Sequence, residues 1–263
     1  MSYLSHWGLE NSPFRRGDHS RFFAGSSQRE AIARLNYLIG GGLSCGLLLS
    51  YPSCGLTSIL RHVSRSAGFG NTAVEMVLTS GDQDSASAVW TDLARALRVR
   101  PDPTSAPSRI SDLIAVASRQ GVRTIWLQDR SQTFAAQVAR QLIDQHHAMT
   151  VVMGAGPDQA KELSVALGHC PLRIELCPLS VDEAAQYVSE SLAASRRVVV
   201  PASRKQVFTD SALIRLHELS EGRIGQINDL CELSLMVAAA NNFSQIDARL
   251  LESVCEETVR AAA

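Results

Sequence analysis

SYPSCGLTS, residues 50–58, lies between a short apolar run and a stretch in which apolar residues have helical spacing. A tight loop between a buried strand and a helix is the setting of the phosphate-binding loop G-x-x-x-x-G-K-[ST]. Gly55 and Thr57 agree with this pattern, whereas Ser50 takes the place of the first glycine and Leu56 the place of the lysine. The segment therefore predicts a phosphate-binding type of loop that lacks its cationic side chain.

The backbone of such a loop can face an anion whatever its side chains are, because its amides and the start of the helix supply a positive dipole. Thr57 is a candidate ligand for Mg²⁺, whereas Leu56 cannot neutralise a phosphate group. An ordinary strand-to-helix turn is the alternative interpretation. The predicted nucleotide-binding positions of the loop are Ser50, Ser53, Cys54, Gly55, Leu56, Thr57 and Ser58.

A second candidate feature follows the strand pattern at Thr124–Leu127. An active ATPase carries two acidic residues there, one for the metal and one to orient the attacking water. This chain has Gln128, Asp129 and Arg130. Asp129 occupies either the metal position, followed by Arg130, or the catalytic position, preceded by Gln128. We expect Asp129 to be catalytic and to bind metal together with Thr57; a turn residue without either role is the alternative.

Strand and helix patterns alternate from about residue 28 to residue 178. Strands separated by helices of this length favour a parallel sheet with helices on both faces. The triple-proline segment 100–108 is expected to be a loop. The predicted helices cover residues 28–39, 57–66, 84–99, 109–120 and 132–146, and the predicted strands cover residues 46–50, 73–78, 122–127, 149–153 and 172–176.

Strand patterns largely stop after Pro178. Ser180 and Glu183 form a capping-box pattern, which marks the start of a helix, and Asp247 is expected to cap a later helix. The fold class is therefore α/β: a P-loop NTPase parallel sheet with helices on both faces, followed by a small all-helical lid domain. The expected division is a core of residues 1–178 and a lid of residues 179–263.

Taken together, these positions resemble the ExeA-type (general secretion pathway protein A) AAA ATPases over nearly the whole chain. The resemblance rests on Tyr3–Leu9 with Pro13–Phe14, Gln28–Leu35, Asp129–Gln132, Gly154 with Pro157–Asp158, Arg173–Ser180, Glu183–Tyr187, and the lid positions Phe208–Thr209, Ala212–Leu213, Gly222, Ile227–Asn228 and Leu230–Cys231. It implies ATP turnover with Mg²⁺, coupled to oligomerisation and remodelling in secretion, pilus assembly or, in related transposition regulators, DNA target handling.

The lid of that family carries an arginine that touches the γ-phosphate after a G-I-P turn. In this chain the turn reads Gly222-Arg-Ile-Gly-Gln226, so the resemblance places Gln226 at the position of the arginine. With the replacements at Ser50, at Leu56 and in the acidic pair, four functional positions differ together. Charge-assisted hydrogen bonds contribute roughly 1.5–3 kcal/mol each, so the loss of two cationic contacts is expected to weaken nucleotide binding ~100-fold or more.

The amino-acid composition limits the classes of protein to which this chain can belong. The hydrophobic fraction of 45% and the charged fraction of 19% are those of a globular protein. No apolar run reaches the ~18 residues of a membrane span, and the N-terminus lacks a signal-peptide core, so a cytoplasmic protein is expected. The formal net charge of −1 gives no general attraction to nucleic acid.

Three hypotheses remain open. The first is a non-hydrolysing scaffold or regulatory subunit that assembles with AAA-type subunits of its own or another kind. The second is a working ATPase that binds ATP and Mg²⁺ and uses Arg61, Arg130 or Arg223 in place of the missing cations. The third is a DNA-binding adaptor, for which a solvated basic surface is the favoured alternative. The basic residues behind the third hypothesis are Arg15, Arg16, Arg21, Arg196, Arg197, Arg204 and Lys205.

Overall fold

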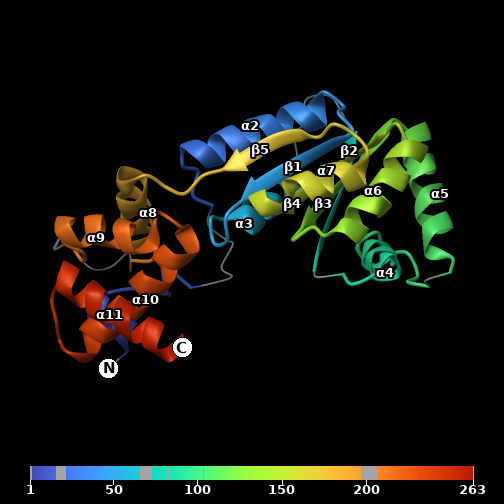
Figure 1. The fold of residues 1–263 in the computed structure, drawn as a ribbon. Helices are drawn as coiled ribbons and strands as arrows, with labels where there is room; N and C mark the ends of the chain where they lie inside the picture. The colour runs from blue at the N-terminus through green and yellow to red at the C-terminus, as the bar shows by residue number, and fades with distance from the viewer. Residues whose placement is uncertain are drawn as a thin grey trace. The chain divides into compact units, whose positions relative to one another are not determined.

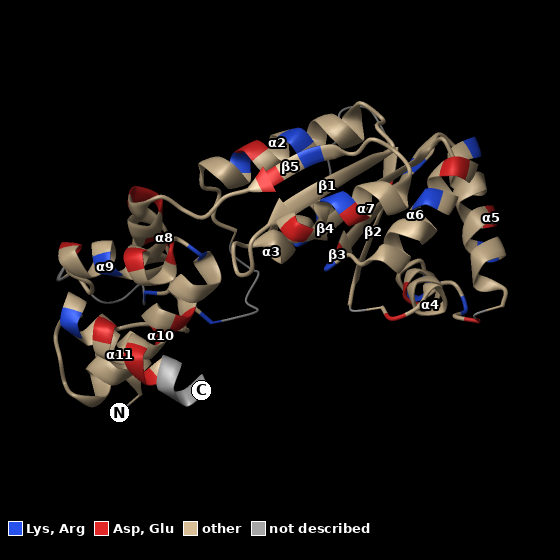
Figure 2. Cartoon of the chain, in the orientation of Figure 1, with Lys and Arg blue, Asp and Glu red and all other residues tan. Residues whose placement is uncertain are grey.

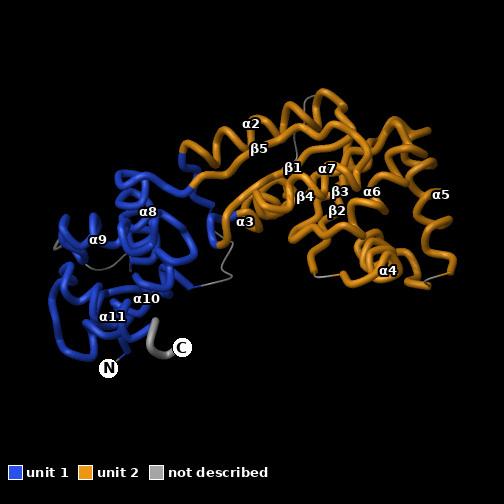
Figure 3. The backbone as a smooth tube through the Cα atoms, in the orientation of Figure 1, with its two compact units in different colours: residues 1–25, 53–55, 178–263 blue, residues 26–52, 56–177 orange. Residues whose placement is uncertain are grey.

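A computed structural model gives the fold of the chain (Figure 1). It describes residues 2–15, 22–65, 73–81, 83–102, 104–196 and 206–262, with side chains described as far as residue 258. The elements separate into two units, shown in different colours in Figure 3. The α/β unit comprises residues 26–52 and 56–177, and the helical unit comprises residues 1–25, 53–55 and 178–263.

Five parallel strands form the sheet of the α/β unit, in the order β2-β3-β4-β1-β5. The strands are β1 (Cys45–Ser50), β2 (Ala73–Ser80), β3 (Val122–Asp129), β4 (Met149–Ala155) and β5 (Leu172–Leu176). Strand β1 pairs with β4 on one side and with β5 on the other, so the loop that follows β1 opens at the carboxyl edge of the sheet. In open α/β sheets this edge is where ligands bind. The predicted parallel α/β fold is confirmed.

Helices cover both faces of this sheet, as the sequence predicts. In β1, Leu47 and Leu49 belong to the core shared with one group of helices, and Leu48 between them points to the opposite face because side chains alternate along a strand. The first group is α4 (Ala86–Ala96), α5 (Ala106–Arg119), α6 (Thr133–Gln145) and α7 (Ala160–Leu167). The opposite face is covered by α2 (Ser26–Gly40) and α3 (Leu56–Ser64).

The helical unit contains α1 (Tyr3–Trp7), α8 (Val181–Ala194), α9 (Asp210–Ser220), α10 (Ile224–Ala240) and α11 (Ala248–Ala262). The capping box predicted at the start of α8 is present, with the Glu183 amide donating to Ser180 Oγ and the Ser180 amide donating to Glu183 Oε2. The predicted cap of α11 is also present, since the Leu250 amide donates to Asp247 Oδ1 at 2.9 Å. Within the described ranges, no helix has both the length and the apolar character needed to cross a bilayer.

The N-terminal segment differs from the expected division. Residues 1–25 cluster with the helical unit and not with the α/β core, because Leu9 and Phe14 are buried among the side chains of its helices. The Glu10 amide also donates to the carbonyl of Ser195, after α8. Local patterns could not reveal this packing, because its partners lie far along the chain.

Two helices differ from the expected elements. Helix α5 begins at Ala106, inside the segment expected to be a loop, because Pro107 stands in the first turn, where its missing N–H is tolerated. Helix α7 was not predicted, since no element was expected between the strands at 149–153 and 172–176. A short 3-10 turn, Pro157–Gln159, leads directly into it, and Leu163 and Leu167 anchor it in the core.

Candidate functional site

The loop after β1 has the strand–loop–helix setting that the sequence predicts. Ser50 is buried at the end of β1, and its hydroxyl donates to the Tyr51 carbonyl at 2.9 Å. Ser53 and Gly55 both have positive φ angles, 66° and 96°. Glycine adopts a positive φ angle without steric penalty, and this explains the glycine at position 55. Helix α3 begins directly afterwards, at Leu56.

Backbone amides are available at this loop. Among the residues that the structure describes, the amides of Gly55, Leu56 and Thr57 donate to no backbone carbonyl. The first amides of any helix lack an internal acceptor and carry the positive end of the helix dipole. The start of α3 can therefore face an anion through its backbone.

The side chain of Leu56 lies on the carboxyl end of β4. A Cβ atom added to Gly154 would approach Leu56 Cδ2 to 2.6 Å, so the leucine occupies the space that the missing side chain leaves. This is an apolar contact at the position where the phosphate-binding pattern has a lysine. The loop segment 50–58 contains no charged residue at all.

Thr57 and Asp129 are brought together across the sheet edge. Thr57 Oγ1 donates to Asp129 Oδ2 at 2.7 Å, and Asp129 is the last residue of β3, with only 5% of its surface exposed. Asp129 therefore lies opposite the hydroxyl at the start of α3, and Arg130 is the residue after it. Arg130 is exposed and has a φ of 53°.

The hydroxyl of Thr57 and the carboxylate of Asp129 are hard oxygen ligands, the kind that Mg²⁺ prefers. In the described part of the chain, no group of three or more His, Cys, Asp or Glu side chains is placed to hold a metal ion. These two residues thus fit one side of a magnesium site, and the remaining ligands would be water or phosphate oxygens.

A buried polar network lies behind Asp129. The Gln128 side chain is fully buried; its Nε2 donates to Gln83 Oε1 and to the Asp129 carbonyl, both at 3.1 Å. Thr79 Oγ1 donates to Gln128 Oε1 and accepts from Trp126 Nε1 at 2.7 Å. Trp126 belongs to the core of the α/β unit, and its indole N–H has a hydrogen-bond partner there.

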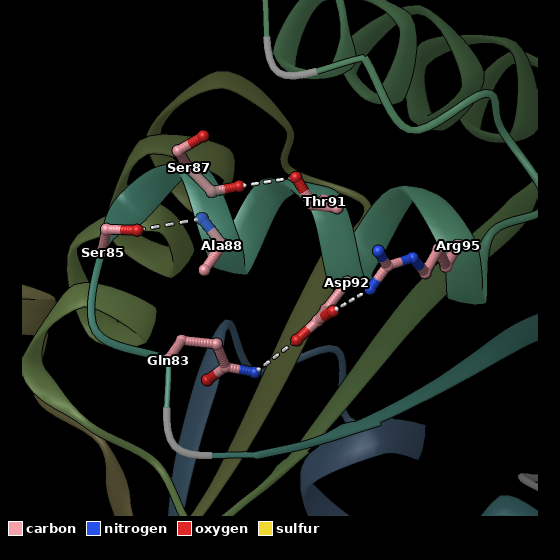
Figure 4. A network of polar contacts seen from close by, with 7 residues as sticks. All are labelled: Gln83, Ser85, Ser87, Ala88, Thr91, Asp92 and Arg95. Atoms are coloured by element: carbon pink, nitrogen blue, oxygen red, sulfur yellow. Dashed lines mark hydrogen bonds and ion pairs between the residues drawn. The ribbon is translucent and has the colours of Figure 1, made fainter.

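The network reaches the surface on α4 (Figure 4). Gln83 Nε2 donates to Asp92 Oδ2 at 3.1 Å, and Asp92 Oδ1 pairs with Arg95 Nη1 at 2.9 Å. Ser85 caps the same helix by accepting from the Ala88 amide at 3.2 Å. A continuous chain of hydrogen bonds therefore joins the end of β3 to an exposed ion pair.

The other predicted loop residues cluster with the helical unit. The Ser53 carbonyl accepts from the Gly225 amide at 2.8 Å, and Cys54 is buried. Gln226 lies next to Gly225 in the first turn of α10 and is partly exposed. The guanidinium of Arg223 is paired with Glu221. Within the helical unit, Ser53 and Gly55 lie close to the turn that precedes Gln226.

Among the residues of the α/β unit that the structure describes, no hydrogen bond or ion pair joins Ser58 or Arg61 to the Thr57–Asp129 pair. Ser58 is partly exposed in the first turn of α3, and Arg61 is partly exposed in its last turn. Of the basic residues proposed for DNA binding, Arg15 and Arg196 are exposed. The others, Arg16, Arg21, Arg197, Arg204 and Lys205, lie outside the described residues.

Sequence reasoning missed the roles of Gly154, Thr79 and Gln83. Gly154 entered the sequence analysis only as a position of the family resemblance, although it is the residue that makes room for Leu56. The available signal for the network was a glutamine directly after the apolar residues 125–127, since a buried glutamine needs hydrogen-bond partners. Such a signal says that partners exist but not which residues they are.

Comparisons with known proteins agree with this fold. No protein-family model matches the chain. General secretion pathway protein A of Aeromonas hydrophila is 24% identical over 259 residues, covering 93% of this chain and 46% of that protein. The chain thus spans less than half the length of this relative.

Solved structures are similar in fold at low sequence identity. The Drosophila origin recognition complex bound to DNA contains a chain with a TM-score of 0.68 at 13% identity, over 98% of this chain and 65% of that one. A RuvB variant of Thermotoga maritima has a TM-score of 0.55 at 13% identity, over 92% and 73%. The chain has the fold of the AAA+ P-loop ATPases, and the weak sequence similarity to general secretion pathway protein A supports an AAA-type protein.

Proposed function

We propose that this AAA-type protein does not hydrolyse ATP and acts as a scaffold or regulatory subunit of an ATPase-driven assembly. The observation that carries the proposal is the contact of Leu56 with Gly154. At the lysine position of the phosphate-binding pattern, the side chain is apolar and is packed on the end of β4. The position therefore serves packing within the α/β unit, and it supplies no positive charge to a phosphate.

The carboxyl end of β3 supports the same proposal. If Asp129 takes the metal position, as its hydrogen bond with Thr57 suggests, Arg130 stands where an active enzyme has the carboxylate that orients water. A guanidinium cannot accept a proton or a hydrogen bond from that water. Phosphoryl transfer depends on positioning and electrostatics, so both replacements are expected to slow hydrolysis strongly.

ATP turnover by the purified full chain tests this proposal. We expect phosphate release no faster than that of the Asp129→Ala variant. Release well above that control would overturn the non-hydrolysing role. Titration calorimetry with Mg-ATP measures binding separately, and the proposal expects binding to be weak or absent, since the loop has lost its cationic side chain.

A working ATPase is the second candidate, because the Thr57–Asp129 pair and the free amides of the loop are compatible with Mg²⁺ and phosphate. Micromolar binding of Mg-ATP together with turnover that requires Asp129 would favour it. Arg223 is a poor substitute cation, since it is already paired with Glu221. Arg130 and Arg61 are the residues to replace with glutamine in that case.

The proposed scaffold or regulatory role requires the chain to assemble with other subunits. The relative named general secretion pathway protein A suggests a secretion process and AAA-type subunits as partners, of this chain or of another. Sedimentation of the protein alone and mixed with an active AAA-type subunit measures this directly. A protein that stays monomeric in both samples contradicts the scaffold role.

DNA binding is the third candidate. The solved structure of the origin recognition complex contains DNA, and RuvB is similar in fold, but likeness at 13% identity concerns the fold alone. In the described part of the helical unit, acidic residues outnumber basic ones. Figure 2 marks the acidic positions of α8, α9 and α11 in red. Retention on duplex DNA that falls with salt would support an adaptor. We expect none.

A further inference from the structure

The helical unit contains a cavity of about 590 Å³ that the nucleotide chemistry does not use. One wall is the N-terminal segment, including Tyr3 and Phe14, and the other is α10, including Glu232, Leu233 and Met236. A volume of this size lies within the range of roughly 300–1,000 Å³ that is typical of ligand sites. All of its lining residues belong to one unit.

Hydrogen bonds fix the N-terminal wall to α10 and the turn after it. The Tyr3 hydroxyl donates to Glu232 Oε1, and Trp7 Nε1 donates to the Leu235 carbonyl at 3.0 Å. A ring nitrogen of His6 lies 2.8 Å from the carbonyl oxygen of Phe243. The cavity is therefore a pre-formed feature of the helical unit, with both walls held in place.

The floor of the cavity is apolar and open. Leu233 and Met236 are spaced three residues apart on α10 and are 37% and 41% exposed, and Phe14 is buried at the opposite wall. Three residues is close to one helical turn, so the two side chains lie on the same face. Large apolar side chains left open in a concave site are a feature of binding surfaces.

The same wall contains an unsatisfied acceptor. Glu232 Oε1 is engaged by Tyr3, but Glu232 Oε2 is buried without a hydrogen-bond partner among the residues that the structure describes. Burial, followed by the hydrogen bond to Glu232, raises the pKa of Tyr3, so its hydroxyl remains a donor at neutral pH. A buried carboxylate oxygen without a donor is unfavourable, and a ligand that supplies an N–H group relieves that penalty.

Charge also favours a cationic ligand. Asp229 lies one helical turn before Glu232 and adds a second carboxylate to the lining. Arg15 carries the opposite charge at the N-terminal wall, but it is exposed, and solvent screens its head group. A ligand with a positively charged N–H donor and an adjacent aliphatic group fits this lining. Its charge matches the carboxylates, and its aliphatic group matches the apolar floor.

We propose that this cavity is a docking site for a segment of a partner protein that presents an arginine or lysine beside an aliphatic side chain. The cation would donate to Glu232, and the aliphatic side chain would pack on Leu233 and Met236. Arginine is the better fit, because its fork of donors can reach two acceptors at once. The site is independent of nucleotide, so it stands or falls separately from the proposed lack of hydrolysis.

Fluorescence polarisation with a labelled Arg-Leu-Leu-Arg peptide tests the proposal on the full chain. The matched probe has citrulline in place of both arginines, which keeps the shape and removes the charge. We expect the citrulline peptide, and also the Glu232→Gln variant, to bind about tenfold or more weakly, the loss of one charge-assisted hydrogen bond. Met236→Ser is expected to weaken binding as well.

Two control variants match these changes elsewhere in the same unit. Glu10→Gln removes an exposed carboxylate, and Ile214→Ser removes an exposed apolar side chain (52% exposed) on α9. Both are expected to leave binding unchanged. Tyr3→Phe keeps the Glu232 charge and releases Glu232 Oε1 from its hydrogen bond with Tyr3. This variant should bind the peptide at least as well as the natural chain does. It also remains informative if Glu232→Gln does not fold.

Equal binding of the arginine and citrulline peptides would overturn the proposal. So would the same loss of binding in Glu10→Gln as in Glu232→Gln, since that result indicates attraction by overall charge. Free arginine that competes as well as the peptide would show that no protein segment is needed, and it would replace the docking role with a small-molecule site.

Discussion

Strands β3 and β4 lie side by side and end at the same edge of the sheet, yet their ends are built differently. At the end of β3, Gln128 and Asp129 are buried polar residues with hydrogen-bond partners on several elements. At the end of β4, Gly154 has no side chain and is covered by the apolar Leu56. One end retains polar chemistry, and the other has become a packing contact.

The difference shows which features of such a site can change independently. The Thr57 hydroxyl and the Asp129 carboxylate are hydrogen-bond partners of each other, so neither group depends on a ligand for a partner. A lysine at position 56 would instead require an anion or water as its partner. Its replacement by leucine removes that requirement and fills the space above a glycine. Substitutions at the polar end of β3 and at the apolar end of β4 should therefore have different consequences for stability.

Thr79→Val should have the largest effect on the polar end. It leaves Trp126 Nε1 and Gln128 Oε1 buried without partners, and each unsatisfied group is unfavourable by about 1–3 kcal/mol. We expect the free energy of opening of β3, measured by amide hydrogen exchange, to fall by about 2–4 kcal/mol. Thr91→Val is the matched control, because its hydroxyl is exposed on α4; it should change little.

Gly154→Ala should have the next largest effect and tests the apolar end. The added methyl group meets Leu56 Cδ2 at 2.6 Å, and overpacking of this kind destabilises by about 1–3 kcal/mol. Because Leu56 is the cause, Leu56→Ala in the same chain should restore most of the loss. A double-mutant cycle by urea unfolding measures the coupling. Additive effects of the two changes would show that the contact is not responsible.

Thr57→Val should have a smaller effect, since it removes one hydrogen bond at a partly buried position. We expect the free energy of unfolding to fall by about 0.5–1.5 kcal/mol, because Asp129 can still be solvated in part. Ser58→Ala, one residue further along the same helix turn, is the control and should change it by less than about 0.5 kcal/mol. Equal losses from both variants would indicate an effect on α3 and not on the pair.

Arg95→Gln should have the smallest effect, at the outer end of the network. Its pair with Asp92 is exposed, and such pairs contribute about 0.2–1 kcal/mol. The effect should disappear when the salt concentration is raised, because the charges are screened. Thermal unfolding at low and high salt measures it. A loss as large as that of Thr79→Val would mean that the ion pair controls the buried network.

Local sequence patterns were sufficient to predict most of the helices and strands of the α/β unit. Alternation of strands and helices up to residue 178 gave the parallel α/β sheet, and Ser180 and Asp247 gave the starts of two helices in the second unit. These features depend on side chains a few residues apart, which is the range of helix caps and of strand alternation. Helix α7 was missed; it has only eight residues, so its apolar spacing extends over little more than two turns.

Within the candidate site, the sequence identified the residue types but not their partners. It placed Leu56 at the lysine position and left Asp129 in one of two registers. The hydrogen bond between Thr57 and Asp129 joins residues 72 positions apart, and no local period predicts a contact at that separation. The same holds for Gly154, whose role depends on a side chain from a different strand–helix connection.

The amino-acid sequence by itself determined the class of fold and the chemical groups missing from the loop, because periodicity and side-chain identity are local properties. The tertiary structure alone decided that Asp129 faces Thr57, that Leu56 covers Gly154, and that Leu9 and Phe14 pack in the core of the helical unit. Each of these depends on chain crossings and on side chains that meet only after the sheet and the helices have assembled.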